Sequence, residues 1–218
     1  MALGPARDRP LIRVGIIDDH PVVGAGTAAL LAVEVDLHVV GVAASLDEAR
    51  ATGLTDPGQV DVLLLDIRLG TDSGLHGLPG AVGAEHGPMP AVIVLTAYDY
   101  PQYADAALRL GAAGFVLKTA PLPELIDAIR RVAAGGLAFA VRPSGIARWH
   151  LTAREREVVR LVVDGRSNDE IGASLGIGAK TVETHLSRLF ERFGLASRTE
   201  LASRALREGW LEVPPTER

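Results

Sequence analysis

Five polar side chains in the first part of the sequence have the types that phosphoryl transfer requires. Each follows a run of apolar residues, and the five are Asp18, Asp19, Asp66, Thr96 and Lys118. Clustered carboxylates repel one another and need a divalent cation, and ligands that are all oxygen atoms suit Mg²⁺. A carboxylate can also attack phosphorus as a nucleophile. The cation, the amine and the hydroxyl would then neutralise the three phosphoryl oxygens.

The apolar runs must bring these side chains together. Short runs rich in β-branched residues predict five strands, and helical patterns separate them; the strands are 13–17, 39–43, 60–65, 91–95 and 114–117, and the helices 22–34, 46–53, 101–111 and 122–134. The alternation predicts an α/β fold with a doubly wound, parallel, five-stranded sheet. The carboxyl ends of such strands share one edge, where these folds place their sites. A single acidic residue there can be an ordinary solvated loop residue, but five polar residues at matching strand ends favour one site.

A second, all-helical region follows. Residues 135–149 read as a linker, and after it three helix starts carry Ser or Thr followed three residues later by Glu: Thr152 with Glu155, Ser167 with Glu170, and Ser197 with Glu200. A further helix begins after Gly178, which can serve as its N-cap. The pattern therefore predicts four helices. The two at 170–175 and 179–193, joined by a glycine turn at 176–178, have helix-turn-helix spacing.

The helix at 179–193 has two distinct faces. A buried stripe is predicted at Val182, Leu186, Leu189 and Phe193. Hydrogen-bond donors gather on the opposite side, with Lys180 at its flank; they are Thr181, Thr184, His185, Arg188 and Arg192. Such donors suit phosphates and base edges of DNA. The alternatives are a solvated face of a helical bundle and, for His185, a packed side chain beside the core.

Composition excludes several classes of protein. The chain of 218 residues has no cysteine, so it has no disulfide and no thiolate metal site. No apolar run reaches about 18 residues, so no membrane span is expected, and we expect a cytoplasmic protein. The net charge is −5, but residues 1–147 hold 10 Lys and Arg against 16 Asp and Glu, whereas residues 148–218 hold 12 against 11. This asymmetry suggests the hypothesis that the acidic first part covers the recognition helix until phosphorylation releases it.

Four motifs, IIDDH, VLLLDI, VIVLTAY and GFVLK, occur in order in residues 13–134. This segment resembles a response-regulator receiver domain, which is flavodoxin-like. Residues 151–208 are similar to the LuxR-type helix-turn-helix, so the whole chain resembles NarL/FixJ-type two-component response regulators. The expected domains are a disordered tail at 1–12, a receiver at 13–134, a linker at 135–149, a DNA-binding domain at 150–212 and a tail at 213–218.

The resemblance implies roles for particular residues of the first domain. A sensor histidine kinase would phosphorylate Asp66. Asp19, Asp66 and the backbone carbonyl of Arg68 would hold Mg²⁺, and Asp18 would act through water. Thr96 and Phe115 fall at the switch positions, where the hydroxyl would move toward the phosphate and the ring would turn inward.

The resemblance also implies double-stranded DNA as a partner, bound by a homodimer that forms on phosphorylation. The outer part of the last helix (198–208) would pair two DNA-binding domains, with Leu201 and Ala205 as candidate residues. The expected protein is not an enzyme, since its receiver would catalyse only its own phosphoryl transfer and dephosphorylation.

Two segments depart from the pattern. After Asp66 the loop reads Arg68 to Gly74 without the usual Pro, and it is longer; the Gly-rich stretch 70–90, with Pro79 and Pro88, predicts a short or irregular helix. On the recognition helix, Glu183 stands where some relatives have a basic residue. It could accept from a cytosine amine or lie outside the groove.

Two other functions are compatible with parts of this pattern. Phosphatases of the haloacid dehalogenase type use an Asp nucleophile with Thr, Lys and Mg²⁺, but they need a second Asp two residues later, where this chain has Arg68. A regulator that ignores phosphorylation could use the receiver only for dimerisation or ligand binding, and the unusual 70–90 loop leaves that alternative open.

Overall fold

The computed structural model describes residues 11–56, 58–70, 72–82, 89–139 and 151–213. The expected tails at 1–12 and 213–218 and the expected linker fall largely outside these ranges. The chain forms two compact units, Met1–Pro143 and Ser144–Arg218. Within the described ranges, none of the helices combines the length and the apolar character that crossing a bilayer requires.

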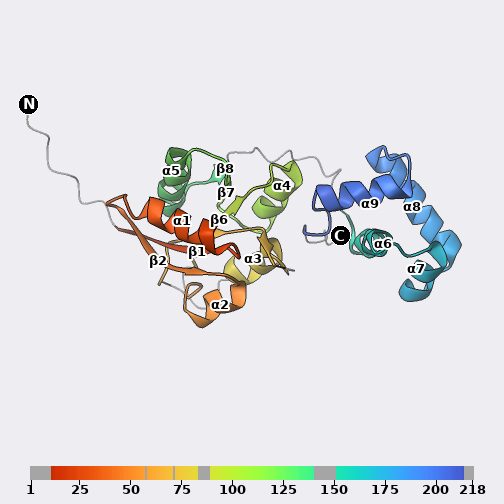
Figure 1. Ribbon diagram of the computed structural model, residues 1–218, viewed down its shortest axis with the longest axis horizontal. Helices are drawn as coiled ribbons and strands as arrows, with labels where there is room; N and C mark the ends of the chain where they lie inside the picture. Colours follow the sequence, from red (N-terminus) through yellow and green to blue (C-terminus); the bar gives the residue numbers. More distant parts are fainter. Residues whose placement is uncertain (1–10, 57, 71, 83–88, 140–150, 214–218) are drawn as a thin grey trace, which may run out of the picture. The chain divides into compact units, whose positions relative to one another are not determined.

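The first unit is a parallel sheet with helices on both faces (Figure 1). Its strand order is β2-β1-β3-β6-β7-β8. The strands are β1 (Ile12–Ile17), β2 (Leu37–Ala43), β3 (Val62–Leu65), β6 (Ala91–Thr96), β7 (Gly114–Leu117) and β8 (Ala138–Phe139). The helices are α1 (Pro21–Leu31), α2 (Leu46–Ala51), α3 (Gly74–Val82), α4 (Pro101–Arg109) and α5 (Leu122–Ala133). The doubly wound α/β fold is confirmed.

The core explains why the strands are almost continuously apolar. On one face, alternate strand residues such as Val14, Val62 and Ile93 pack with Leu31 of α1 and Ile129 of α5 in one buried cluster. The intervening residues of β3 and β6, such as Leu63 and Val94, are buried too, and α2, α3 and α4 contact the sheet from the other side. Burial on both faces favours apolar side chains along these inner strands.

The structure corrects the predicted strand count. Ala138 and Phe139, placed in the linker by sequence, form a sixth strand that pairs with Gly114 and Phe115 of β7. Gly114 permits this approach, because a Cβ there would lie 2.9 Å from the carbonyl oxygen of Ala138. The crossover helix in 70–90 is short, as expected: α3 has nine residues. A two-stranded antiparallel hairpin, β4 (Arg68–Leu69) with β5 (Asp72–Ser73), precedes it.

An ion-pair cluster joins α5 to the turn before β2. The Arg130 guanidinium donates to both oxygens of Asp36, at 2.8 and 2.6 Å, and to Glu34 at 2.8 Å. The Asp36 side chain is only 7% exposed, so its charge depends on this partner.

Replacing Asp36 by asparagine should therefore destabilise the first unit by about 2 kcal/mol, because a partly buried guanidinium loses its main counter-ion. Calorimetric unfolding of the full chain measures the loss. The matched control is Asp47→Asn, since Asp47 forms an exposed pair with Arg50 and its side chain is 93% exposed; its effect should stay below about 0.5 kcal/mol. Equal effects of the two variants would contradict the structural role of Asp36.

The second unit contains four helices, α6 (Ala153–Val163), α7 (Asn168–Leu175), α8 (Ala179–Phe193) and α9 (Arg198–Arg207), which confirms the predicted all-helical region. Two of the three predicted capping boxes are complete, at Thr152 and Ser167. The third is only half formed. Ser197 accepts from the Glu200 backbone N–H, but the Glu200 carboxylate accepts from the backbone N–H of Ala196. Gly178 is the N-cap of α8, as predicted.

The predicted apolar stripe of α8 is buried. Val182, Leu186, Leu189 and Phe193 enter one core cluster with α6, α7 and α9. Trp210, beyond α9, closes this core with its ring centroid 4.4 Å from that of Phe193. The opposite face of α8 therefore points away from this core.

Candidate functional site

The carboxyl edge of the sheet brings the predicted residues together. Asp18 follows β1, Asp66 follows β3, Thr96 ends β6 and Lys118 follows β7. The Lys118 ammonium lies 2.7 Å from Asp18 Oδ2 and 2.7 Å from Asp66 Oδ2. Side chains separated by about a hundred positions thus form one connected group.

The acidic residues form a potential cation site. Ligand atoms of Asp18, Asp19, His20 and Asp66 lie within 4.8 Å of one another. Three converging carboxylates fit a hard divalent cation, which prefers oxygen ligands. His20 was not among the predicted residues. Its Nδ1 lies 2.8 Å from Asp19 Oδ1, and its backbone N–H donates to Asp18 Oδ1 at 3.0 Å. Its position directly after the aspartate pair was the available signal.

Burial and charge act in opposite directions at this cluster. Burial raises the pKa of the Asp66 carboxyl, and the neighbouring Lys118 only partly offsets this. Burial alone would lower the pKa of Lys118, but hydrogen bonds to Asp18 and Asp66 outweigh it and raise that pKa. Lys118 is therefore a fixed positive charge beside Asp66, suited to pairing with an anion.

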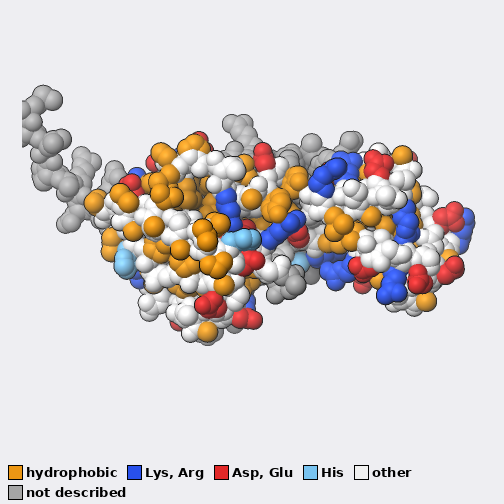
Figure 2. All heavy atoms as spheres, in the orientation of Figure 1, with side chains coloured by type: hydrophobic (Ala, Val, Ile, Leu, Met, Phe, Trp, Pro, Cys, Tyr) orange, Lys and Arg blue, Asp and Glu red, His pale blue; other side chains and the backbone are white. Residues whose placement is uncertain are grey.

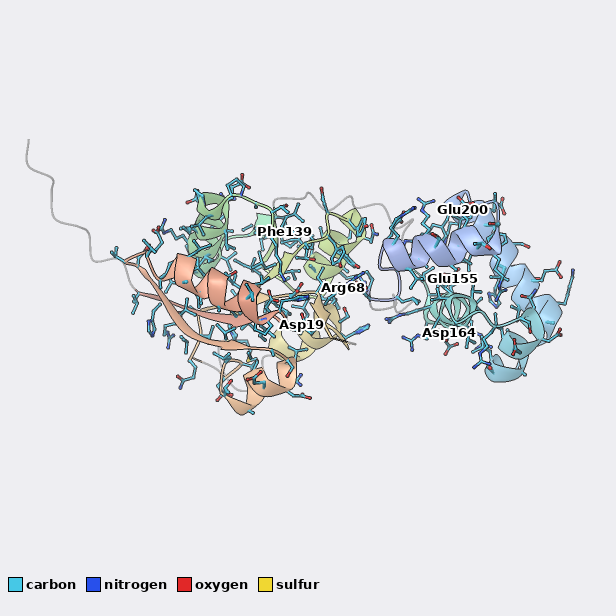
Figure 3. The ribbon with its side chains drawn as sticks, in the orientation of Figure 1. Asp19, Arg68, Phe139, Glu155, Asp164 and Glu200 are labelled. Atoms are coloured by element: carbon cyan, nitrogen blue, oxygen red, sulfur yellow. The ribbon has the colours of Figure 1, made fainter. Side chains whose placement is uncertain are left out.

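The hairpin after Asp66 contacts Asp19 of the cluster and also Tyr98. Figure 3 labels Arg68 of this hairpin and Asp19. The Gly70 backbone N–H donates to Asp19 Oδ2 at 2.8 Å, and the chain turns there with φ +61°. The Arg68 guanidinium donates to the Tyr98 hydroxyl at 2.7 Å and lies 4.1 Å from the centre of its ring. The described residues of the longer loop noted in the sequence are thus part of the site. The Arg68 carbonyl as a metal ligand stays a prediction.

The predicted switch residues are both fully buried. Thr96 Oγ1 accepts a hydrogen bond from the Tyr98 backbone N–H at 3.2 Å. That contact leaves the hydroxyl hydrogen of Thr96 available to donate. The Phe115 ring already lies inward in this structure. Tyr98, two residues after Thr96, was missed by the sequence reasoning because its partner, Arg68, lies 30 positions away.

The outward face of α8 carries the predicted DNA-binding residues. Lys180, Thr181, Thr184 and Arg188 are exposed and His185 is half-buried. Two side chains have local partners: Lys180 pairs with Glu183 at 2.8 Å, and the Thr184 hydroxyl donates to the Lys180 carbonyl. In Figure 2, positive and negative side chains alternate over this unit, in keeping with its near-neutral charge. The partner of Arg192 lies on another helix, because its guanidinium donates to Glu155 of α6.

The prediction that Leu201 and Ala205 lie at a dimer surface is wrong. Leu201 is 0% exposed and Ala205 is 1% exposed, because both pack into the core of their own unit. Buried side chains cannot pair two domains. The apolar residue that α9 exposes is Leu206, at 57%.

Comparison with known proteins identifies both units. Residues 14–130 match the response regulator receiver domain, and residues 150–205 match the bacterial regulatory proteins of the luxR family. The transcriptional regulatory protein UhpA of Salmonella typhimurium is 39% identical over 207 residues, covering 92% of this chain and 100% of the relative. A probable transcriptional regulatory protein NarL of Mycobacterium tuberculosis is 34% identical, covering 92% and 96%.

Solved structures give the same result. The response regulator RcsB in complex with DNA is 26% identical, with a TM-score of 0.59, covering 91% of this chain and 98% of that one. RcsB from Salmonella enterica serovar Typhimurium, bound to promoter DNA in the presence of the phosphomimetic BeF₃⁻, is also 26% identical, with a TM-score of 0.60, covering 88% and 96%.

Proposed function

The chain belongs to the response regulators that join a receiver domain to a LuxR-type helix-turn-helix, and from this premise we propose that phosphorylation of Asp66 controls its binding to double-stranded DNA. It is a two-component transcription factor and not a conventional enzyme. The alternative hypothesis, a phosphatase of the haloacid dehalogenase type, is therefore rejected.

The observation that carries the proposal for Asp66 is its pairing with Lys118 in a pocket of carboxylates. A carboxylate oxygen of Asp66 attacks the phosphorus of a phosphohistidine donor on a sensor kinase. The new O–P bond forms as the P–N bond breaks, and the leaving imidazole nitrogen takes up a proton. Lys118 and the hydroxyl of Thr96 are placed to pair with the phosphoryl oxygens.

The residues proposed to hold Mg²⁺ are Asp18, Asp19, Asp66 and the backbone carbonyl of Arg68. The donor set fits, because carboxylate oxygens converge within 4.8 Å. When bound, Mg²⁺ supplies positive charge to the phosphoryl oxygens. In this role Asp18 acts through water and also fixes Lys118, whose ammonium it contacts. Thr96 and Phe115 then report the phosphoryl group to the rest of the unit.

For DNA, we assign contacts to Lys180, Thr181, Thr184, His185 and Arg188. Their support is the outward position of these donors on the second helix of a helix-turn-helix, the helix that enters the major groove. A homodimer bound to two half-sites is the natural assembly, since one short domain makes few contacts. The exposed Leu206 of α9 is a better candidate for its interface than the two buried residues. We propose that the protein acts in the cytoplasm.

The experiment that tests this function selects double-stranded DNA from a random pool with protein phosphorylated by acetyl phosphate. Affinity for the selected DNA is then measured with and without the phosphodonor. Tighter binding with the phosphodonor is expected. Equal affinity in both states would instead favour a regulator that ignores phosphorylation.

In the same assay, Arg188→Ala should weaken binding about tenfold if it loses a base or phosphate contact. If the contact is to a phosphate, the slope of log affinity against log salt should also fall by about one. Arg50→Ala, which removes an exposed arginine from α2 of the receiver, is the control and should keep the wild-type slope. Unchanged affinity in Arg188→Ala would remove Arg188 from the contact surface.

A further inference from the structure

Arg192, at the C-terminal end of the recognition helix α8, is exposed but pairs with a residue of its own unit. Its guanidinium donates to Glu155 Oε2 of α6 at 3.0 Å. The two side chains are 34% and 17% exposed, so the pair is only partly solvated. The guanidinium carbon also lies 4.6 Å from the centre of the Phe193 ring, which packs on Trp210 in the core.

The Glu155 carboxylate accepts a second hydrogen bond besides that from Arg192. The same Oε2 atom accepts from the Thr152 backbone N–H at 2.9 Å, which closes the capping box of α6. Burial alone would raise the pKa of Glu155, but the Thr152 N–H and Arg192 outweigh it and lower that pKa. The carboxylate is therefore ionised and joins the first turn of α6 to the last turn of α8.

The position of Arg192 along α8 favours a role in support over a role in contact. Arg192 lies eleven residues beyond Thr181, which is about 16 Å along the helix axis. In helix-turn-helix proteins the N-terminal residues of the recognition helix reach the base edges. A cation in the last turn instead stabilises the carbonyl end of the helix.

We propose that Arg192 and Glu155 are a positioning pair for DNA binding: the pair fixes the C-terminal end of α8 against α6, and Arg192 does not contact DNA. The inference deepens the DNA-binding function proposed above and rests on it. Arg192 accordingly leaves the set of DNA-contacting residues predicted from the sequence.

The two roles predict opposite effects of Glu155→Gln. Glutamine can still accept from the Thr152 N–H, so the capping box survives while the ion pair is lost. If Arg192 contacts a phosphate, freeing it and removing a negative charge should strengthen binding. If the pair positions α8, the same change should weaken binding.

The experiment measures affinity for the selected double-stranded DNA at several salt concentrations, using the phosphorylated full chain. It compares wild type, Glu155→Gln, Arg192→Gln and the double variant. We expect each single variant to weaken binding about three- to fivefold, and the double variant to lose no more than either alone, because both remove one interaction. The salt slope should stay at the wild-type value in all of them.

Glu200→Gln is the matched control, since Glu200 stands at the equivalent position of α9 and caps a backbone N–H (Figure 3). Its affinity should stay within about twofold of wild type. Stronger or unchanged binding by Glu155→Gln, or a salt slope reduced by about one in Arg192→Gln, would overturn the inference. Should Glu155→Gln lose its helical circular-dichroism signal, the slope of Arg192→Gln decides alone. Failure of the wild type to bind DNA would instead refute the proposed function.

Discussion

Replacing Asp66 by asparagine is expected to abolish phosphorylation by acetyl phosphate and Mg²⁺. The amide oxygen of asparagine is a poor nucleophile. In the proposed site the neighbouring Asp18 and Asp19 serve the cation and Lys118 instead of accepting the phosphoryl group. Intact-mass spectrometry should show one added phosphoryl group on the wild type and none on the variant.

The control for this loss is Asp47→Asn. It makes the same chemical change at an exposed carboxylate of α2 that contacts Arg50. This variant should gain the phosphoryl group as the wild type does. Chelation of Mg²⁺ by EDTA should prevent labelling of both proteins, because the phosphoryl charge would then lack its cation. A phosphoryl group on Asp66→Asn at the wild-type rate would place the acceptor at another residue.

The convergence of Asp18, Asp66 and Lys118 could be predicted because it depends on the sheet alone. Each residue follows a nearly continuous apolar run, and parallel strands end at a common edge. The direct contacts of Lys118 with both carboxylates were not predicted, since β3 and β6 lie between β1 and β7 and only the long lysine side chain spans that distance.

The contacts of the post-acceptor hairpin could not be predicted in this way. Arg68 contacts Tyr98, and Gly70 contacts Asp19, across sequence separations of 30 and 51 residues. Such contacts depend on how a loop folds, and neither strand of the hairpin exceeds two residues. Elements that short carry no readable periodicity. Strand β8 was not predicted for the same reason, since it also has only two residues.

Helix periodicity identified faces but not partners. It correctly placed Val182 and Phe193 in the core of the second unit. The same reasoning put Arg192 on the outward face, where it is exposed, and the family resemblance suggested Leu201 and Ala205 for a dimer interface. A helical wheel does not include the neighbouring helix, so it missed Glu155 beside Arg192 and the core around the other two residues.

Gly74 packs directly against the backbone of the phosphorylation site. It begins α3, directly after the hairpin, and its backbone N–H donates to the Ile67 carbonyl at 2.6 Å. A Cβ at this position would lie 2.0 Å from the backbone carbonyl oxygen of Asp66. Because backbone atoms cannot rotate away, any side chain here must displace either the acceptor or the start of α3.

Gly74→Ala is therefore expected to destabilise the receiver by about 1–3 kcal/mol through overpacking. It should also slow phosphorylation by acetyl phosphate, since the shift acts on the residue that must align with the donor. Calorimetric unfolding and the rate of mass gain measure the two effects.

Gly26→Ala is a control that should change the stability in the opposite direction. Gly26 lies within α1, and a Cβ there would meet nothing within 4 Å. Alanine should stabilise that helix by about 0.5–1 kcal/mol, because glycine loses more backbone entropy on folding. The phosphorylation rate should stay at the wild-type value. If Gly74→Ala matched Gly26→Ala in stability and rate, close packing of α3 against the acceptor would not be what glycine provides at position 74.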